Sequence, residues 1–183
     1  MVAMIIYLSW IITEVVLNRF VRSKKVDSAA DDNSLKTIWI VVIASTILAS
    51  IVGFWFPLPI YRSDFGFNTF LAFLLLGLCI RLYAVWSLGK MFTVDVAIRQ
   101  DHALKSDGIY RYVRHPSYTG LCMCFVGLGG SMNHWLAAAL IVLPFLWVII
   151  LRINVEEKAL LAHFGAAYSD YCQRTKRLIP FVY

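Results

Sequence analysis

The sequence predicts an all-α, polytopic integral membrane helix bundle with about five transmembrane helices and a C-terminal amphipathic helix. Hydrophobic residues make up 60% of the 183-residue chain, charged residues make up 15%, and the mean hydropathy is +0.71. Soluble domains average roughly 45–50% hydrophobic and 25% charged residues. A soluble globule of this size could not bury so much apolar surface, and the same composition excludes intrinsic disorder. We therefore expect a single membrane domain over residues 1–183.

Five apolar runs supply the expected spans, because a bilayer core needs about 20 apolar residues per helix. The runs cover residues 2–21, 37–56, 67–88, 118–131 and 134–153. The first lacks the basic start and small-residue cleavage site of a signal peptide, and the second stops at a Pro-Leu-Pro sequence. The fourth is short for a span and carries four glycines, which favour close helix packing. A tight turn joins the fourth run to the fifth.

The basic residues predict the orientation of these spans. Of the 17 Lys and Arg residues, 15 lie in three segments, residues 19–36, 89–117 and 152–177. The loops on the opposite side of the five-span topology hold only Arg62, and Arg81 lies inside the third span. By the positive-inside rule, the N-terminus is outside and the C-terminus is cytoplasmic. The net charge of +6 then reports topology rather than nucleic-acid binding.

The segment that follows the fifth span is expected to be helical from Asn154 to about Tyr171. Its apolar side chains recur every four residues, which gives one apolar stripe, and Gly165 is a candidate break after Phe164. An amphipathic helix just beyond a span is expected to lie along the membrane surface or over a cytoplasmic pocket. The four cysteines form neither a disulfide framework nor a CxxC zinc pair, so no metal is expected.

Chemically reactive residues gather in two predicted cytoplasmic stretches, residues 89–118 and 152–157. Pro116 is expected to begin the fourth helix, because proline is tolerated in a first turn and keeps His115 out of the helical region. The free N–H groups of that turn would favour an anionic group. An equally simple interpretation is an interfacial helix start whose polar and aromatic side chains anchor to headgroups.

Four charged residues each allow a structural and a functional interpretation. Arg152 and Glu156 are four residues apart, which fits an i,i+4 ion pair or a snorkelling arginine as well as a site. Glu14 and Arg81 lie inside expected spans, where charges are costly and usually paired. They could pair with each other, or Arg81 could reach the cytoplasmic site.

Taken together, these motifs resemble those of the isoprenylcysteine carboxyl methyltransferase (ICMT) family of integral-membrane enzymes, with phospholipid N-methyltransferases as looser relatives. The motifs are HALKSDGIY at 102–110, RHPSYTG at 114–120, RINVEE at 152–157, FGxxYxxY at 164–171 and LIPF at 178–181. The resemblance covers about the C-terminal half, from Leu88 onward. It implies a cofactor-binding and catalytic half in residues 89–183, which follows the three N-terminal spans that the apolar runs predict in residues 1–88.

The resemblance implies S-adenosylmethionine (SAM) as the cofactor, bound at the cytoplasmic face in a pocket that the C-terminal segment closes. The implied cofactor contacts are His102, Ala103, Leu104, Lys105, Tyr110, His115, Pro116, Ser117, Tyr118 and Glu156. It also implies catalytic roles for Arg152 and Glu156, with Arg152 on the substrate side.

The expected activity is methyl transfer to the carboxylate of a lipophilic, isoprenylcysteine-like substrate. A carboxylate needs a cation to orient it, and the planar guanidinium of Arg152 matches it in a bidentate way. One alternative is a phospholipid amine or small lipophilic thiol as acceptor; an amine would need a base such as His115 or Glu157. Another is a non-catalytic membrane subunit or transporter. The expected partners are a lipophilic or prenylated substrate and membrane lipids, without nucleic acid or metal.

Overall fold

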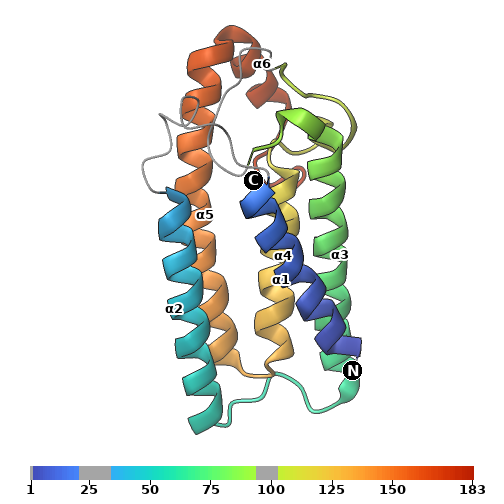
Figure 1. The fold of residues 1–183 in the computed structure, drawn as a ribbon, viewed down its shortest axis with the longest axis vertical. Coiled ribbons are helices and arrows are strands. Elements are labelled where there is room, and N and C mark those ends of the chain that lie inside the picture. Colours follow the sequence, from blue (N-terminus) through green and yellow to red (C-terminus); the bar gives the residue numbers. More distant parts are fainter. Residues whose placement is uncertain (1, 21–33, 94–102) are drawn as a thin grey trace.

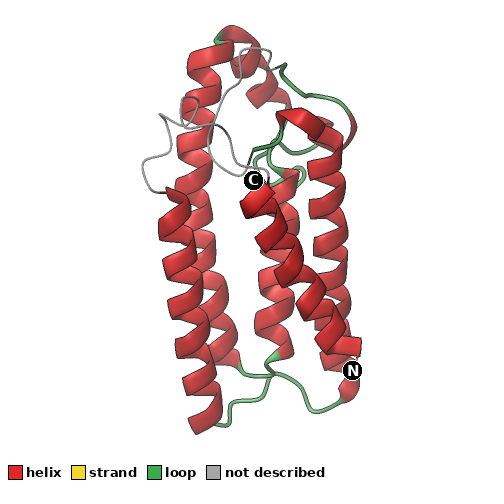
Figure 2. Cartoon of the chain, in the orientation of Figure 1, coloured by secondary structure: helices red, strands yellow, loops and turns green. Residues whose placement is uncertain are grey.

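The computed structural model describes residues 2–20, 34–93 and 103–183, and helices joined by loops make up the described part (Figures 1 and 2). Five longer helices form a bundle, and a short sixth helix lies at one end. Their bounds are α1 (Val2–Phe20), α2 (Ser34–Trp55), α3 (Asp64–Leu88), α4 (Pro116–Ser131), α5 (Trp135–Phe164) and α6 (Ala166–Arg174). Two 3-10 turns, η1 (Gly89–Met91) and η2 (Gly108–Arg111), lie between α3 and α4. The all-α prediction is confirmed.

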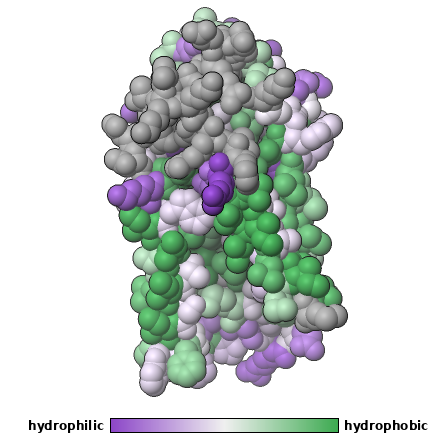
Figure 3. Space-filling model, in the orientation of Figure 1, coloured by the Kyte–Doolittle hydropathy of each residue, from purple (hydrophilic) through white to green (hydrophobic). Residues whose placement is uncertain are grey.

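Four of the described helices, α1, α2, α3 and α5, are long and apolar enough to cross a membrane. Helix α4 has only 16 residues, which is shorter than a full span. Figure 3 shows the apolar side chains as a broad band over the helices, with hydrophilic residues toward the ends. The protein is therefore a multi-pass integral membrane protein.

Glycines bring α3 and α4 into close contact, as their number in the fourth apolar run predicted. A Cβ atom built on Gly120 would lie 2.5 Å from the backbone oxygen of Gly77, and one on Gly127 would lie 2.6 Å from the Leu74 Cβ. Such approaches exclude any side chain at these positions. Aromatic stacking then joins α4 to α5, with the Phe125 and Phe145 ring centroids 3.9 Å apart.

The turn between α4 and α5 locks the loop that follows α2. Asn133 adopts a positive φ of 51°, and its side-chain oxygen accepts hydrogen bonds from the backbone N–H groups of Ile60 and Tyr61, both at 2.9 Å. His134 caps α5 by accepting a hydrogen bond from the N–H of Ala137 at 3.0 Å. The expected tight turn at 131–134 is confirmed.

The expected helical structure beyond the fifth span and its break at Gly165 are confirmed, but no boundary separates the span from the tail at Asn154. Residues 154–164 continue α5, which runs for 30 residues because nothing between Ile153 and Phe164 interrupts it. The break falls at Gly165, whose φ of 54° suits glycine. As a result, the second half of α5 projects beyond the other spans, and α6 folds back at its end (Figure 1).

Candidate active site

One cavity lies where the segments that carry the sequence motifs meet the ends of the helices. The end of α3, the turn η1, residues 103–105 and the turn η2 form one part of its wall. The start of α4, the second half of α5 and α6 form the rest. Every predicted site residue in the described part of the chain lines it: Ala103, Leu104, Lys105, Tyr110, His115, Pro116, Ser117, Tyr118, Arg152 and Glu156. His102 lies outside the described residues. Segments separated by about 50 residues in sequence thus converge on one site.

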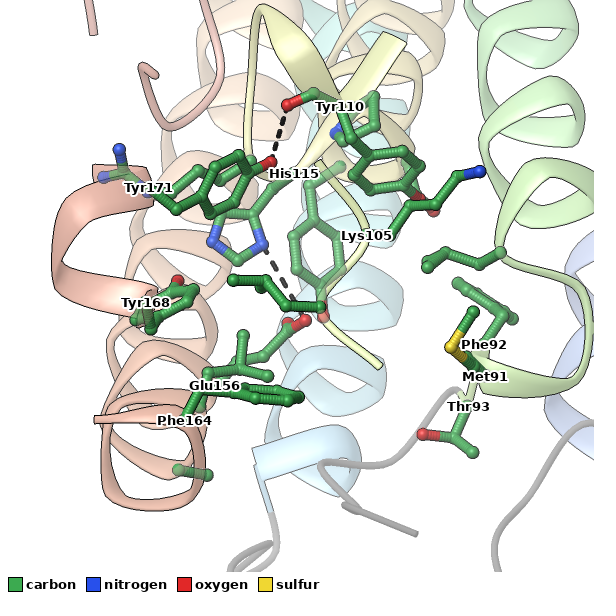
Figure 4. Close-up of a pocket in the computed structure, with 18 of the residues that line it drawn as sticks. Met91, Phe92, Thr93, Lys105, Tyr110, His115, Glu156, Phe164, Tyr168 and Tyr171 are labelled. Atoms are coloured by element: carbon green, nitrogen blue, oxygen red, sulfur yellow. Dashed lines mark hydrogen bonds and ion pairs between the residues drawn. The ribbon is translucent and has the colours of Figure 1, made fainter. Parts of the chain in front are cut away.

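Sequence reasoning did not assign several other residues of the cavity wall. Figure 4 shows Met91, Phe92 and Thr93 across the cavity from Glu156 and the aromatic residues of α5 and α6. No motif marks the segment that follows α3. The repeated aromatic spacing at 164–171, by contrast, was a signal for the remaining aromatic wall residues, which are Phe164, Tyr168 and Tyr171.

Helix α4 begins at Pro116, as predicted, and its first turn faces the cavity. His115 precedes it with φ −123° and ψ 58°, outside the helical region. The His115 side chain is 4% exposed, and its ring lies 5.6 Å from the ring of Tyr118 in a stacked arrangement. The proline therefore fixes both the direction of the helix and the position of the histidine.

The extended segment after α6 holds the loop that carries His115. The N–H of Arg114 donates to the Lys176 carbonyl at 2.7 Å, and the N–H of His115 donates to the Arg177 carbonyl at 3.1 Å. Val113 and Lys176 form a parallel β-bridge. These backbone bonds fasten the C-terminal segment beside the cavity.

Glu157 is the centre of a charge cluster behind the cavity. Its carboxylate accepts from Arg114 Nε at 2.9 Å and from Arg177 Nη2 at 2.6 Å, and it contacts His115 Nε2 at 3.3 Å. Arg114 also donates to the Thr175 carbonyl at 2.5 Å. Because two guanidinium groups already share it, Glu157 serves to hold the loop and the C-terminal segment together.

Polar atoms on the cavity wall remain available for a ligand. Glu156 Oε2 and the Tyr168 hydroxyl are both buried and lack a hydrogen-bond partner within the described part of the chain. An unpaired buried polar atom is costly, so both fit a ligand that brings hydroxyl or amino groups. Burial, with a contribution from Glu157, raises the pKa of Tyr168 above its ordinary value of 10.0, which keeps its hydroxyl protonated.

Tyrosine side chains brace the same wall. The Tyr171 hydroxyl donates to the Tyr110 carbonyl at 2.6 Å, and the Tyr110 hydroxyl donates to the Ala84 carbonyl at 3.2 Å. Burial raises the pKa of both phenols. They link α6, η2 and α3 around the cavity, as the bond between Tyr171 and Tyr110 in Figure 4 shows.

Arg81 and Glu14 form the expected buried pair. Arg81 Nη2 donates to Glu14 Oε2 at 2.7 Å and Nε donates to Oε1. Arg81 Nη1 also donates to the Ser117 hydroxyl at 2.8 Å. Arg81 thus pairs with Glu14 and also lines the cavity.

Arg152 is also held in place, and it is 2% exposed. Its Nη1 donates to the Ser34 hydroxyl, and its Nε donates to the Tyr118 hydroxyl at 3.4 Å. Arg152 thereby connects the starts of α2 and α4 with α5. Its guanidinium is fixed by several helices instead of extending freely from the end of a span.

A second, largely apolar cavity of about 330 Å³ adjoins the first. It runs between α1, α2, α4 and α5. Three residues, Arg81, Tyr118 and Arg152, line both cavities. A polar compartment and an apolar compartment therefore meet at two buried guanidinium groups.

The fold is a multi-pass membrane helix bundle in which a cavity lined by polar side chains adjoins a largely apolar one. The model of the isoprenylcysteine carboxyl methyltransferase (ICMT) family matches residues 70–162. The chain belongs to this family.

Individual relatives agree with the family match. The chain is 33% identical over 130 residues to a protein-S-isoprenylcysteine O-methyltransferase of Schizosaccharomyces pombe, covering 68% of this chain and 55% of that one. It is 33% identical over 122 residues to protein-S-isoprenylcysteine O-methyltransferase B of Arabidopsis thaliana, covering 66% and 60%. The chain thus spans little more than half the length of these relatives.

A solved structure of the eukaryotic intramembrane Ras methyltransferase ICMT is similar to this fold. The TM-score is 0.65 at 28% sequence identity, and the similarity covers 80% of this chain and 53% of that one. Most of the described bundle therefore has a counterpart in that structure.

Proposed function

We propose that this protein is a SAM-dependent carboxyl O-methyltransferase that acts on a lipophilic, isoprenylcysteine-like carboxylate at the membrane–cytoplasm boundary. The observation that carries the proposal is the junction of the polar and the apolar cavity at Arg152, Tyr118 and Arg81. A water-soluble cofactor and a membrane-embedded substrate could meet there without either leaving its own phase.

The polar cavity has the donors and acceptors that SAM requires. Glu156 Oε2 can accept from ribose hydroxyls or an ammonium group, and the Tyr168 hydroxyl can donate. His115 and Tyr118 offer aromatic faces, and aromatic faces attract cations such as a sulfonium. Lys105 offers a positive charge to a carboxylate of the ligand. These residues would hold the cofactor.

When bound, SAM would supply an electrophilic methyl group, and a carboxylate acceptor could receive it without losing a proton. The chain must then bring the acceptor into line and exclude water, which accounts for much of such catalysis. Arg152 would orient the acceptor carboxylate through its planar guanidinium. Its fixed contacts to Tyr118 and Ser34 mean that little reorganisation is needed.

The charge cluster makes Glu157 a poor candidate for the base that an amine acceptor would need. An amine must lose a proton to a base, and the candidate bases were His115 and Glu157. Glu157 is shared by Arg114 and Arg177, at 2.9 and 2.6 Å, and it contacts His115. A carboxylate that stabilises two cations is a poor base. A carboxylate acceptor needs no base, because it is already deprotonated.

The proposal includes a membrane orientation with the N-terminus outside. The long loops and α6 would then lie in the cytoplasm, where SAM is available. The support is the distribution of Lys and Arg, 15 of which fall in three segments on one side of the predicted topology.

Purified protein in lipid nanodiscs provides the test. It is incubated with methyl-labelled SAM and an S-geranylated N-acetylcysteine that carries a free carboxylate; the matched amide of the same compound, a lipophilic primary amine and a lipophilic thiol serve as comparisons. We expect label in a base-labile ester of the carboxylate alone. Label in the amine or thiol alone would overturn the carboxylate assignment. SAM binding without transfer to any acceptor would contradict the enzymatic proposal.

A further inference from the structure

The apolar cavity has a defined length along the helices. On α4 its wall consists of Tyr118, Leu121, Phe125 and Leu128, which follow one helical stripe. Ten residues of helix at 1.5 Å per residue give about 15 Å from the junction to Leu128. On α1 the wall runs from Asn18 to Tyr7, which is a similar length. The cavity is therefore an elongated slot parallel to the bundle, partly open along its side, with one end at the two arginines.

Contacts between helices mark the other end of the slot. The Tyr7 hydroxyl of α1 donates to the Ser131 hydroxyl at the last residue of α4, at 2.7 Å. Leu128 and Thr46 line the same end. The Thr46 hydroxyl donates to the Val42 carbonyl at 2.7 Å, which satisfies its polar group within its own helix. This end is thus apolar toward the slot and fastened between α1 and α4.

We infer that the far end of this slot, formed by Tyr7, Thr46 and Leu128, sets the length of the apolar chain that the acceptor carries. This inference rests on the proposed carboxyl methyltransferase function. Carbon–carbon bonds of about 1.5 Å advance an extended chain by roughly 1.3 Å each, so about 15 Å holds about 12 bonds. Counted from the acceptor carboxylate through the cysteine thioether, that leaves about 9 carbons of an S-alkyl chain inside the slot.

Longer chains must bend out of the slot or meet its end. Each misfitting methylene in a hydrophobic pocket changes specificity by roughly tenfold or more. The substrate class is therefore a carboxylate with a medium-length apolar chain, preferred over carboxylates whose chains are substantially longer. Tyr7 and Thr46 belong to helices α1 and α2, which lie outside residues 70–162, whereas Leu128 lies within that range, so two of the three residues at the far end fall in the part of the chain that the family match does not include.

The test uses a series of S-alkyl N-acetylcysteines with straight chains of about 8 to about 18 carbons. For the wild type we expect kcat/KM to peak at about 8–10 carbons and to fall by tenfold or more by about 16 carbons. Leu128→Ala should move the maximum to longer chains. Thr46→Leu should move it to shorter chains. Longer chains partition more strongly into the bilayer, which alters kcat/KM for every variant alike. The kcat/KM of each variant is therefore divided by the wild-type value at the same chain length.

Matched controls separate the slot from general effects on the helices. Leu143→Ala makes the same change as Leu128→Ala at an outward-facing position that is 63% exposed. Ser50→Leu parallels Thr46→Leu, because the Ser50 hydroxyl also donates to a carbonyl four residues earlier, at 2.8 Å, but Ser50 faces outward. Both controls should keep the wild-type chain-length profile.

The outcomes distinguish this inference from the proposed function. A flat chain-length profile in an active enzyme, or equal shifts in the variants and their controls, would overturn the inferred limit on chain length. Either result would leave the proposed methyltransferase function standing. Absence of transfer to every member of the series would overturn the proposed function itself. Binding of the same series measured by thermal shift without SAM should follow the same order of chain lengths, which gives a readout apart from turnover.

Discussion

Arg152 is the residue on which the assignment of the acceptor depends. If it orients a carboxylate, Arg152→Ala should lower turnover per SAM-binding site by roughly a hundredfold, similar to the loss of one preorganised donor to developing charge. Arg152→Lys should recover little, because an ammonium lacks the planar fork. Turnover normalised to bound SAM is the measurement. Arg62→Ala, at an exposed position outside both cavities, is the control.

A merely structural arginine would give a different result. Loss of the contacts to Ser34 and Tyr118 alone would lower the amount of folded protein, with near-normal turnover in each molecule that still binds SAM. That outcome would remove Arg152 from the acceptor site.

Glu156 should act on the cofactor side of the junction. Its Oε2 atom has no partner among the described residues, so Glu156→Gln should weaken SAM binding by about 1.5–3 kcal/mol, as expected for a lost hydrogen bond to a charged group. Calorimetry in nanodiscs measures this affinity directly. Lys158→Gln, two residues further on, is the control for charge on the same helix. Wild-type affinity in Glu156→Gln would place the cofactor elsewhere.

Among the helices, the contact between α3 and α4 determines whether the site can assemble. Gly120→Ala would place a Cβ 2.5 Å from the Gly77 oxygen, a backbone atom that cannot move aside locally. We expect destabilisation by about 1–3 kcal/mol from overpacking. Gly53→Ala in α2 has its nearest neighbour at 3.9 Å and should be neutral or slightly stabilising. Thermal unfolding of both variants in the same nanodiscs compares them, and equal midpoints would contradict this packing.

The buried ion pair connects α1 to the rest of the bundle. Glu14→Gln leaves Arg81 buried without its carboxylate, which should cost about 3–5 kcal/mol of stability. The double variant Glu14→Gln with Arg81→Gln removes both charges and should recover part of that loss. A double-mutant cycle on unfolding free energies gives the coupling energy. Additive losses would show that the two side chains do not interact.

The sequence predicted most of the helices and much of the site, for identifiable reasons. Apolar runs located the spans to within a few residues, and Pro116 marked the start of α4 correctly. The sequence did not show that the fifth span continues into the tail without a boundary, because hydropathy falls at Asn154 while helical geometry continues to Gly165. The junction of the two cavities could not be predicted, since it depends on how Arg81, Tyr118 and Arg152 meet across three helices.

The whole molecule should be inserted with α6 and the polar cavity in the cytoplasm. In a chain whose four native cysteines have been replaced, single cysteines at Ser63 and Ser169 report the two ends, because both positions are exposed. A membrane-impermeant thiol reagent added to intact cells should label position 63 and not position 169. Permeabilised cells, in which both should react, provide the control. The reverse pattern in intact cells would overturn the orientation and the cytoplasmic cofactor site.

The parallel pairing of residues 112–115 with the segment after α6 also has a consequence for biosynthesis. Arg114 and Thr175, which that pairing brings into contact, are separated by 61 residues. During translation, the loop that carries His115 therefore emerges long before the extended segment that fastens it, and α4 and α5 must insert into the bilayer in the interval. A nascent chain interrupted after α5 would hold every membrane helix but leave the His115 loop unfastened. The wall of the cavity would then be fastened only after the segment that follows α6 has been made.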